Sequence, residues 1–131
     1  LYDRYKNFQI DAVAGIESHG FILAGILAGK LGKGVVLIRK PGKLPAETIS
    51  EEYNLEYGVD SIEIHKDAIS HGQNILLIDD LIATGGTALA SCKLIEQLGG
   101  RIVECCFPIE LSDLKGREKL SRYPVYSLIK F

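Results

Sequence analysis

The stretch from Ile75 to Thr87, ILLIDDLIATGGT, constrains the fold more than any other part of the chain. It opens with an uninterrupted apolar run, which is typical of a central parallel strand covered on both faces. Two acidic residues, a loop of small residues and a helical pattern follow. Open parallel sheets bind ligands at the carboxyl ends of their strands. The stretch therefore predicts both an α/β sheet and the edge at which its site lies.

The rest of the chain alternates between apolar strands and helical segments, which indicates a single α/β domain over residues 1–131. We expect a mostly parallel central sheet flanked by helices. The predicted strands are 10–16, 35–38, 61–65, 74–80, 102–109 and 125–131, and the predicted helices are 21–31, 87–98 and 115–120. The helix 21–31 is apolar nearly all round, so we expect it to be buried.

The segment from Pro41 to Gly58 interrupts this rhythm. It has no strong apolar period and carries two prolines and several charges. A connection of this length is unusual inside a compact domain, and functional lids are a common reason for one. We expect an irregular, flexible lid.

The loop after the acidic pair predicts a phosphate site. Ala83 to Thr87 can turn several backbone N–H groups toward one point, since glycine permits positive φ and close approach. The following helix adds the positive end of its dipole, and the hydroxyl of Thr84 adds a donor. Ionised Asp79 and Asp80 are pure acceptors, which suits the two vicinal hydroxyls of a ribose. Together these features indicate a ribose 5-phosphate site.

Composition and charge narrow the classes of function. A formal net charge of −2 argues against a general nucleic-acid binder, which would normally be basic. The longest apolar run, Phe21 to Ala28, is too short to cross a membrane. Three cysteines, two of them adjacent, suggest neither a disulfide framework nor a zinc site. We therefore expect buried thiols in a reducing compartment, the cytoplasm.

The stretch from Ile75 to Thr87 resembles the phosphoribosyl pyrophosphate (PRPP) motif of the type I phosphoribosyltransferases. Further segments resemble the adenine phosphoribosyltransferases within that family: LIRKPGKLP from Leu37, LEYG from Leu55, IEIHKD from Ile62 and LKGREKL from Leu114. The similarity covers nearly the whole chain in one order. It implies a type I phosphoribosyltransferase fold and the reaction of adenine with PRPP to give AMP and pyrophosphate. It also implies a homodimer, and Mg²⁺ carried by the substrate's phosphates rather than by protein ligands.

The resemblance implies a role for each matching residue. Asp79 and Asp80 would bind the ribose hydroxyls, and residues 83–87 would hold the 5′-phosphate. Residues 17–20, ESHG, would form the pyrophosphate loop, which in this family often contains a non-proline cis peptide. Glu56 would be the catalytic group over the reacting centre. The implied substrate-binding residues are Ser18, His19, Arg39, Lys40, Lys43, Tyr57, Asp79, Asp80, Ala83, Thr84, Gly85, Gly86 and Thr87.

Three of these assignments concern basic residues after strand 35–38. Charge patterning alone is equally consistent with two interpretations of Arg39, Lys40 and Lys43, a solvated face or an anion site. The adjacent phosphate motif favours the anion site. Arg39 is expected to reach across the dimer interface.

Two departures from the family pattern stand out. His19 replaces an arginine of the family, so pyrophosphate binding would lack a permanent charge and a bidentate fork there. The family's N-terminal hood, which contacts the purine, has no counterpart before Leu1. The assignment of adenine as the base therefore rests on the overall resemblance and not on visible base-reading residues.

Two other functions fit parts of the pattern. A phosphoribosyltransferase for another purine base would share the phosphate and ribose residues. A PRPP-sensing regulator would bind PRPP without turnover, but it would need a DNA-binding domain. Glu56 and Tyr57 favour the enzyme. His65 and His71 lack acidic or cysteine partners at metal-ligand spacing, and we assign them no metal.

Overall fold

The central sheet forms from the apolar runs that the sequence displays. The computed structural model describes residues 1–55 and 57–131. Its main sheet has the strand order β2-β1-β5-β7-β6, with β8 also pairing with β7, and all these pairs are parallel. The strands are β1 (Ala12–Ile16), β2 (Gly34–Ile38), β5 (Asn74–Ile78), β6 (Leu81–Ile82), β7 (Arg101–Glu110) and β8 (Val125–Lys130). The predicted parallel α/β architecture is confirmed.

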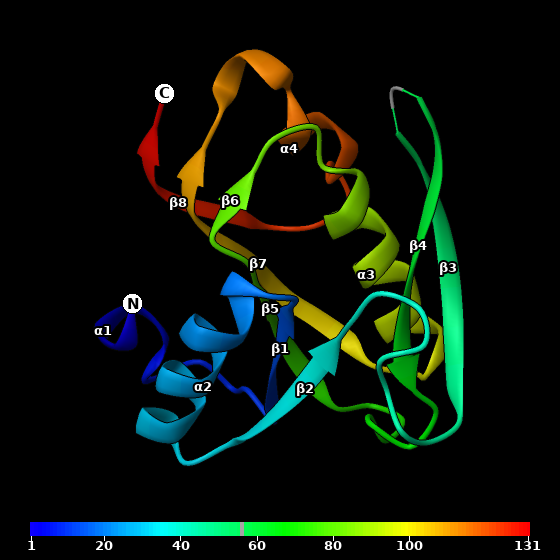
Figure 1. Ribbon diagram of the computed structural model, residues 1–131. Coiled ribbons are helices and arrows are strands. Elements are labelled where there is room, and N and C mark those ends of the chain that lie inside the picture. Colours follow the sequence, from blue (N-terminus) through cyan, green and yellow to red (C-terminus); the bar gives the residue numbers. More distant parts are fainter. Residues whose placement is uncertain (56) are drawn as a thin grey trace.

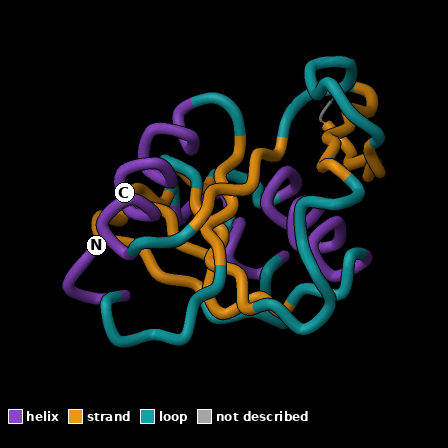
Figure 2. The backbone as a smooth tube through the Cα atoms, turned by 90° about the horizontal axis from the view of Figure 1, so that it is seen from below, coloured by secondary structure: helices purple, strands orange, loops and turns teal. Residues whose placement is uncertain are grey.

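Helices cover both faces of this sheet. Figures 1 and 2 show α2 (His19–Leu31) on one face and α3 (Gly86–Gln97) on the other. The shorter helices are α1 (Tyr2–Tyr5), η1 (Ser112–Leu114) and α4 (Gly116–Lys119). Within the described ranges, no helix has the length and apolar character needed to span a membrane.

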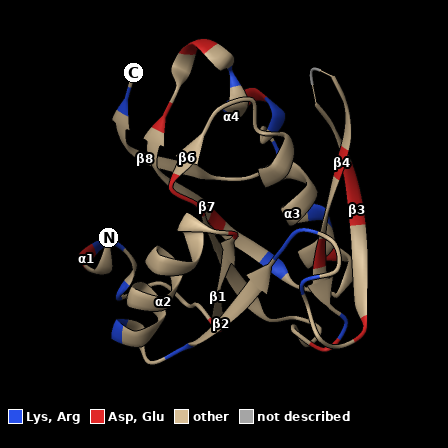
Figure 3. Ribbon diagram, in the orientation of Figure 1, with Lys and Arg blue, Asp and Glu red and all other residues tan. Residues whose placement is uncertain are grey.

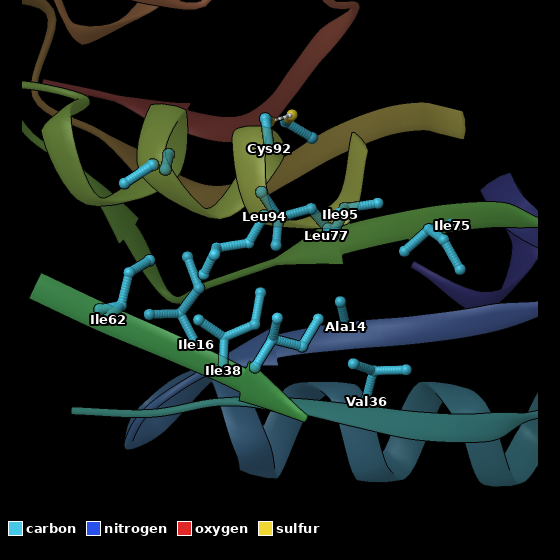
Figure 4. Packing of buried hydrophobic residues seen from close by; sticks show 14 of the residues in the cluster. Ala14, Ile16, Val36, Ile38, Ile62, Ile75, Leu77, Cys92, Leu94 and Ile95 are labelled. Carbon is cyan, nitrogen blue, oxygen red and sulfur yellow. Dashed lines mark hydrogen bonds between the residues drawn. The ribbon is translucent and has the colours of Figure 1, made fainter. Parts of the chain in front are cut away.

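The apolar run of β5 is explained by its position between two cores. Ile75 and Leu77 belong to the cluster on the α3 face, which Figure 4 shows, whereas Leu76 and Ile78 belong to the cluster on the α2 face. All four side chains are fully buried. Burying each one contributes about 1.5–3 kcal/mol, so both faces of the strand stabilise the fold.

The expectation that helix 21–31 is buried all round is wrong. Ile22 and Ile26 of α2 are 63% and 59% exposed. One turn apart, they lie on the same side of the helix, while Ala24 and Leu27 are buried. A helix on the outside of a sheet has only one covered face, and the apolar residues on its other face remain open.

The expectation that the segment from Pro41 to Gly58 is irregular is also wrong for the part of it that forms a strand. Within the segment, Thr48–Leu55 forms the strand β3, which pairs antiparallel with β4 (Gly58–His65). This hairpin packs on α3, where Ile62 and Ile64 are fully buried and Ile49 and Tyr53 partly so (Figure 1). The charged residues between Ile49 and Tyr53 conceal the period-two pattern of the strand. Hydrogen bonds between Arg39 and Glu63 join the hairpin to the chain after β2.

Candidate functional site

The candidate site lies at the edge where the carboxyl ends of β1 and β5 meet. Residues 17–20 leave β1 and enter α2, while the acidic pair leaves β5 and leads through β6 and residues 83–85 into α3. Since the strands are parallel, both helices begin at this edge, one on each face of the sheet. The predicted pyrophosphate loop and the predicted ribose phosphate loop are thereby brought together.

The small-residue loop forms a pocket of about 200 Å³. Gly85 adopts φ +86° and caps the N-terminus of α3. The first N–H groups of a helix have no partner within it, so those of the first turn are available to an anion. The pocket is lined by Asp79, Leu81, Ile82, Ala83, Thr84, Gly85, Gly86, Thr87, Ala88 and Phe107. This pocket, which we call the cradle, has the backbone N–H groups and the helix N-terminus that suit an anion such as phosphate.

Asp79 of the acidic pair lines this cradle, and Asp80 follows it in the chain. The backbone N–H of Asp80 donates to Oδ1 of Asp79 over 2.8 Å. Burial raises the pKa of Asp79 to about 7, and the neighbouring Asp80 charge adds to this, while the backbone hydrogen bond opposes it. The charged form of Asp79 is therefore costly until a ligand or cation compensates it.

Close approach between α2 and β5 depends on Gly20. A Cβ atom there would lie 3.0 Å from the carbonyl oxygen of Ile78 and 3.1 Å from Oδ1 of Asp79. Glycine thus lets the start of α2 pack against the acidic pair. His19, one residue earlier, lies with Nδ1 3.0 Å from Oδ2 of Asp80. The Glu17–Ser18 peptide is cis, as the family resemblance led us to expect.

Glu17 contacts all three basic candidates. The sequence placed it in the predicted pyrophosphate loop but indicated no separate role for it. Its carboxylate lies 2.5 Å from Nζ of Lys43 and 3.5 Å from Nε of Arg39, and it accepts the backbone N–H of Lys40 over 2.6 Å. Burial would raise the pKa of Glu17, but these partners outweigh it and hold the pKa below its usual value. An acidic residue directly after a buried strand, with a later basic cluster, was the available signal.

The side chains of the three basic candidates do not all have the same partner. Lys43 and Arg39 face Glu17, whereas Nζ of Lys40 bonds to Asp60 and to the hydroxyl of Tyr53 on the hairpin. Figure 3 shows this concentration of Lys and Arg in the chain that leaves β2. These cations therefore form ion pairs with carboxylates of the protein.

The two candidates at the hairpin turn are not seen to contact the described site residues: one is exposed and the other lies outside the described residues. Tyr57 is 90% exposed at the turn between β3 and β4. Glu56, the expected catalytic residue, lies outside the described residues. Further down the hairpin, a Cβ atom at Gly86 would lie 3.5 Å from the ring of Tyr53. The hairpin thus contacts the cradle helix at Tyr53, within β3.

The three cysteines and His65 are not among the residues that line the cradle. The thiols of Cys92, Cys105 and Cys106 are free and fully buried, as expected. Nε2 of His65 lies 3.4 Å from the backbone nitrogen of Ala46. Across residues 1–55 and 57–131, no three His, Cys, Asp or Glu side chains are grouped to hold a metal ion.

Comparisons with known proteins agree with this geometry. The family model described as "Phosphoribosyl transferase domain" matches residues 1–131. The chain is 59% identical to adenine phosphoribosyltransferase of Chloroflexus aurantiacus, over 100% of this chain and 76% of that protein.

Two solved structures of adenine phosphoribosyltransferases are also similar to this chain. The adenine phosphoribosyltransferase of Thermoanaerobacter pseudethanolicus superposes with a TM-score of 0.95 at 52% identity, covering 98% of this chain and 76% of the other. The Saccharomyces cerevisiae enzyme, complexed with an imino-altritol bisphosphate and adenine, gives 0.92 at 46% identity, covering 98% and 73%.

Proposed function

Because the chain belongs to the adenine phosphoribosyltransferase family, we propose that this site transfers the 5-phosphoribosyl group of PRPP to adenine, giving AMP and pyrophosphate in purine salvage. One observation carries the assignment. The phosphate cradle, the acidic pair and the loop of His19 meet at a single sheet edge. The bisphosphate and adenine bound by the Saccharomyces cerevisiae relative support the same pair of ligand classes.

The cradle and the acidic pair would hold the ribose phosphate. The N–H groups at the start of α3 and the hydroxyls of Thr84 and Thr87 would donate to the 5′-phosphate. Asp79 and Asp80 would accept from the two ribose hydroxyls. Because Asp80 also faces His19, occupying the diol position would free the imidazole to turn toward the pyrophosphate.

The basic residues would stabilise the leaving group. Breaking the C1–O bond leaves positive charge on the ribose and negative charge on pyrophosphate, and fixed cations lower the energy of that separation. Arg39, Lys40 and Lys43 would supply them. The pyrophosphate would then compete with Glu17 for Lys43 and with Asp60 for Lys40.

Mg²⁺ would enter with the phosphates of the substrate. Asp79 lines the cradle, and carboxylate oxygens are ligands that Mg²⁺ prefers, so the residues present are compatible with an ion held mainly by the substrate's phosphates. Its charge would neutralise part of the departing pyrophosphate.

Glu56 and Tyr57 would act on the base. As N9 of adenine attacks C1, the imidazole ring of the purine becomes more acidic, and a carboxylate at N7 could stabilise or accept the proton. The family resemblance gives this role to Glu56. Glu56→Gln should lower kcat by about 10²–10⁴-fold with much smaller changes in substrate affinity. An unchanged kcat, measured where chemistry limits turnover, would contradict the role.

A homodimer and a cytoplasmic location complete the proposal. Ile22 and Ile26 of α2 are exposed, and so are Val35 and Leu37 of β2 at the sheet edge. Val35 and Leu37 alternate with side chains buried toward α3, so they lie on the α2 face. An apolar surface of this kind suits a second copy. The free buried thiols suit a reducing compartment.

Product formation tests the proposal. The protein is incubated with PRPP and Mg²⁺ and with adenine, hypoxanthine or guanine in turn, and nucleotides are separated by chromatography. We expect AMP from adenine and little product from the other bases. Product mainly from another base would make the chain a different purine phosphoribosyltransferase. PRPP binding without any product would indicate a regulatory protein.

A further inference from the structure

The start of α4 lies directly against the phosphate cradle. A Cβ atom at Gly85 would lie 2.6 Å from the carbonyl oxygen of Gly116 and 3.1 Å from its Cα. Conversely, a Cβ atom at Gly116 would collide with the carbonyl oxygen of Ala83 and lie 2.8 Å from Cγ1 of Ile82. Figure 1 shows α4 beside the loop that leads from β6 into α3. Two backbones thus meet without side chains between them.

Arg117 fixes the position of this contact. Its guanidinium forms a fork on Glu110, with Nε 3.2 Å from Oε2 and Nη2 2.7 Å from Oε1. Nη1 donates to the carbonyl oxygen of Val125 over 2.7 Å, and Nη2 lies 3.3 Å from Oγ of Ser127. Oγ of Ser127 also donates to Glu110 over 2.8 Å. One side chain therefore ties α4 to the ends of both β7 and β8.

The same strand end supports the cradle from its other side. Glu110 pairs with Ile82 in the register between β7 and β6, and the N–H of Leu111 donates to the carbonyl oxygen of Ile82 over 3.0 Å. The Glu110 side chain is only 8% exposed, and the hydrogen bonds from Arg117 hold its pKa below the usual range. Such a pair is costly to break, because it would leave a buried charge without a partner.

The backbone leading into α4 adopts a conformation that has a cost. Lys115 has φ +56° and ψ +33°, the left-handed region, which is about 1 kcal/mol less favourable for a residue with a side chain. That turn delivers Gly116 to the cradle. The surrounding bonds of Arg117 hold the turn in place.

We propose that Gly116 and Arg117 are positioning residues for the 5′-phosphate. They touch no substrate themselves. Gly116 closes the back of the cradle and so sets where the N–H groups near Gly85 point, and Arg117 holds Gly116 there. This rests on the proposed function, which assigns the cradle to the 5′-phosphate. A displacement approaching 1 Å would lengthen several N–H···O bonds at once.

Binding measurements separate positioning from general stability. Calorimetry gives the affinities of the wild type, Gly116→Ala and Arg117→Gln for AMP and for adenosine, which lacks only the phosphate. AMP affinity should fall about 10- to 100-fold in both variants, while adenosine affinity changes less than twofold. Arg117→Lys, which keeps the charge but loses the fork, should restore only part of the AMP affinity.

Two glycines provide matched controls. A Cβ atom at Gly29 meets no atom within 4 Å, so Gly29→Ala should leave AMP affinity unchanged and raise stability slightly, as expected for alanine within a helix. A Cβ atom at Gly100, beyond the far end of α3, would lie 2.8 Å from Cγ2 of Ile95. Gly100→Ala should therefore lower the unfolding temperature while AMP affinity is kept.

The outcomes distinguish the possibilities. Equal losses of AMP and adenosine affinity, or no loss in a folded variant, would overturn the positioning role. If Gly116→Ala does not fold, the Arg117 pair of variants decides the question. Wild-type protein that binds AMP no better than adenosine would contradict the proposed function itself.

Discussion

Replacing Asp79 with Asn should make the protein more stable above neutral pH. Burial raises the pKa of Asp79 to about 7 from an ordinary value of 3.8, so the folded protein holds this proton far more tightly than the unfolded chain. Asparagine keeps the shape and the Oδ1 acceptor for the N–H of Asp80, but it has no charge to desolvate. The substitution removes only the ionisation cost.

The magnitude follows from the two pKa values. At 1.36 kcal/mol for each tenfold change in proton affinity, the ceiling is about 4 kcal/mol. Asp79 keeps some solvent contact, so we expect about 1–3 kcal/mol. Below pH 3.8 both states hold the proton and the cost vanishes. Between about pH 4 and 7 it grows, because only the unfolded chain ionises freely, and above pH 7 it is constant.

Urea unfolding at pH 5 and pH 8 measures this difference. The free energy of unfolding of Asp79→Asn should exceed that of the wild type by about 1–3 kcal/mol at pH 8 and by less at pH 5. Asp80→Asn is the matched control, since the Asp80 side chain is 43% exposed and keeps much of its hydration. Parallel pH dependences for the wild type and Asp79→Asn would refute the reasoning.

Three further predictions concern the same region. Asp80→Asn should weaken AMP binding by about 1–3 kcal/mol in calorimetry, because a ribose hydroxyl loses its acceptor, and unchanged affinity would make the pair merely structural. Glu17→Gln should lower the free energy of unfolding by about 1–2 kcal/mol at pH 7. Since the folded state depresses the pKa of Glu17, this difference should disappear as the pH falls through that pKa, and a constant difference would argue against an ionic role. Ile26→Glu should halve the mass found by light scattering if the α2 face joins two copies; an unchanged dimer would place the interface elsewhere.

The sequence was most informative about features that are determined by a short stretch of neighbouring residues. The run from Ile75 to Ile78 predicted a doubly covered strand, and these residues alternate between the two cores. The loop 83–87 predicted an anion cradle, because glycine lets several backbone N–H groups turn toward one point and the following helix adds the positive end of its dipole. Both predictions depend on local chain geometry.

The features that could not be predicted depend on residues distant in the chain. The half-buried face of β3 includes Glu51, which accepts a hydrogen bond from Gln97 over 2.9 Å, so its strand pattern does not register as apolar. The pairing of Glu17 with Lys43 is likewise set by tertiary folding. β6 has only two residues, too few for any periodicity.

The β3–β4 hairpin acts as an arm that is fixed at one end. Ile62 and Ile64 hold its base in the core, whereas Leu55 and Val59 near the turn are half exposed or more. The stretch from Ile62 to Gly58 is about 14 Å long, so a tilt of about 20° would move Gly58 by about 5 Å. It would also shift Tyr53, which pairs with Asp60 and packs on the core.

The contacts of Lys40 with the hairpin oppose such a movement. Lys40 lies outside the arm and bonds to Asp60 and Tyr53 within it. The cation that would meet the pyrophosphate is therefore the one that fastens the arm. An anion that draws Lys40 away would remove this tie to Asp60 and Tyr53, so ligand binding and the hold on the hairpin would be coupled through the Lys40 ammonium group.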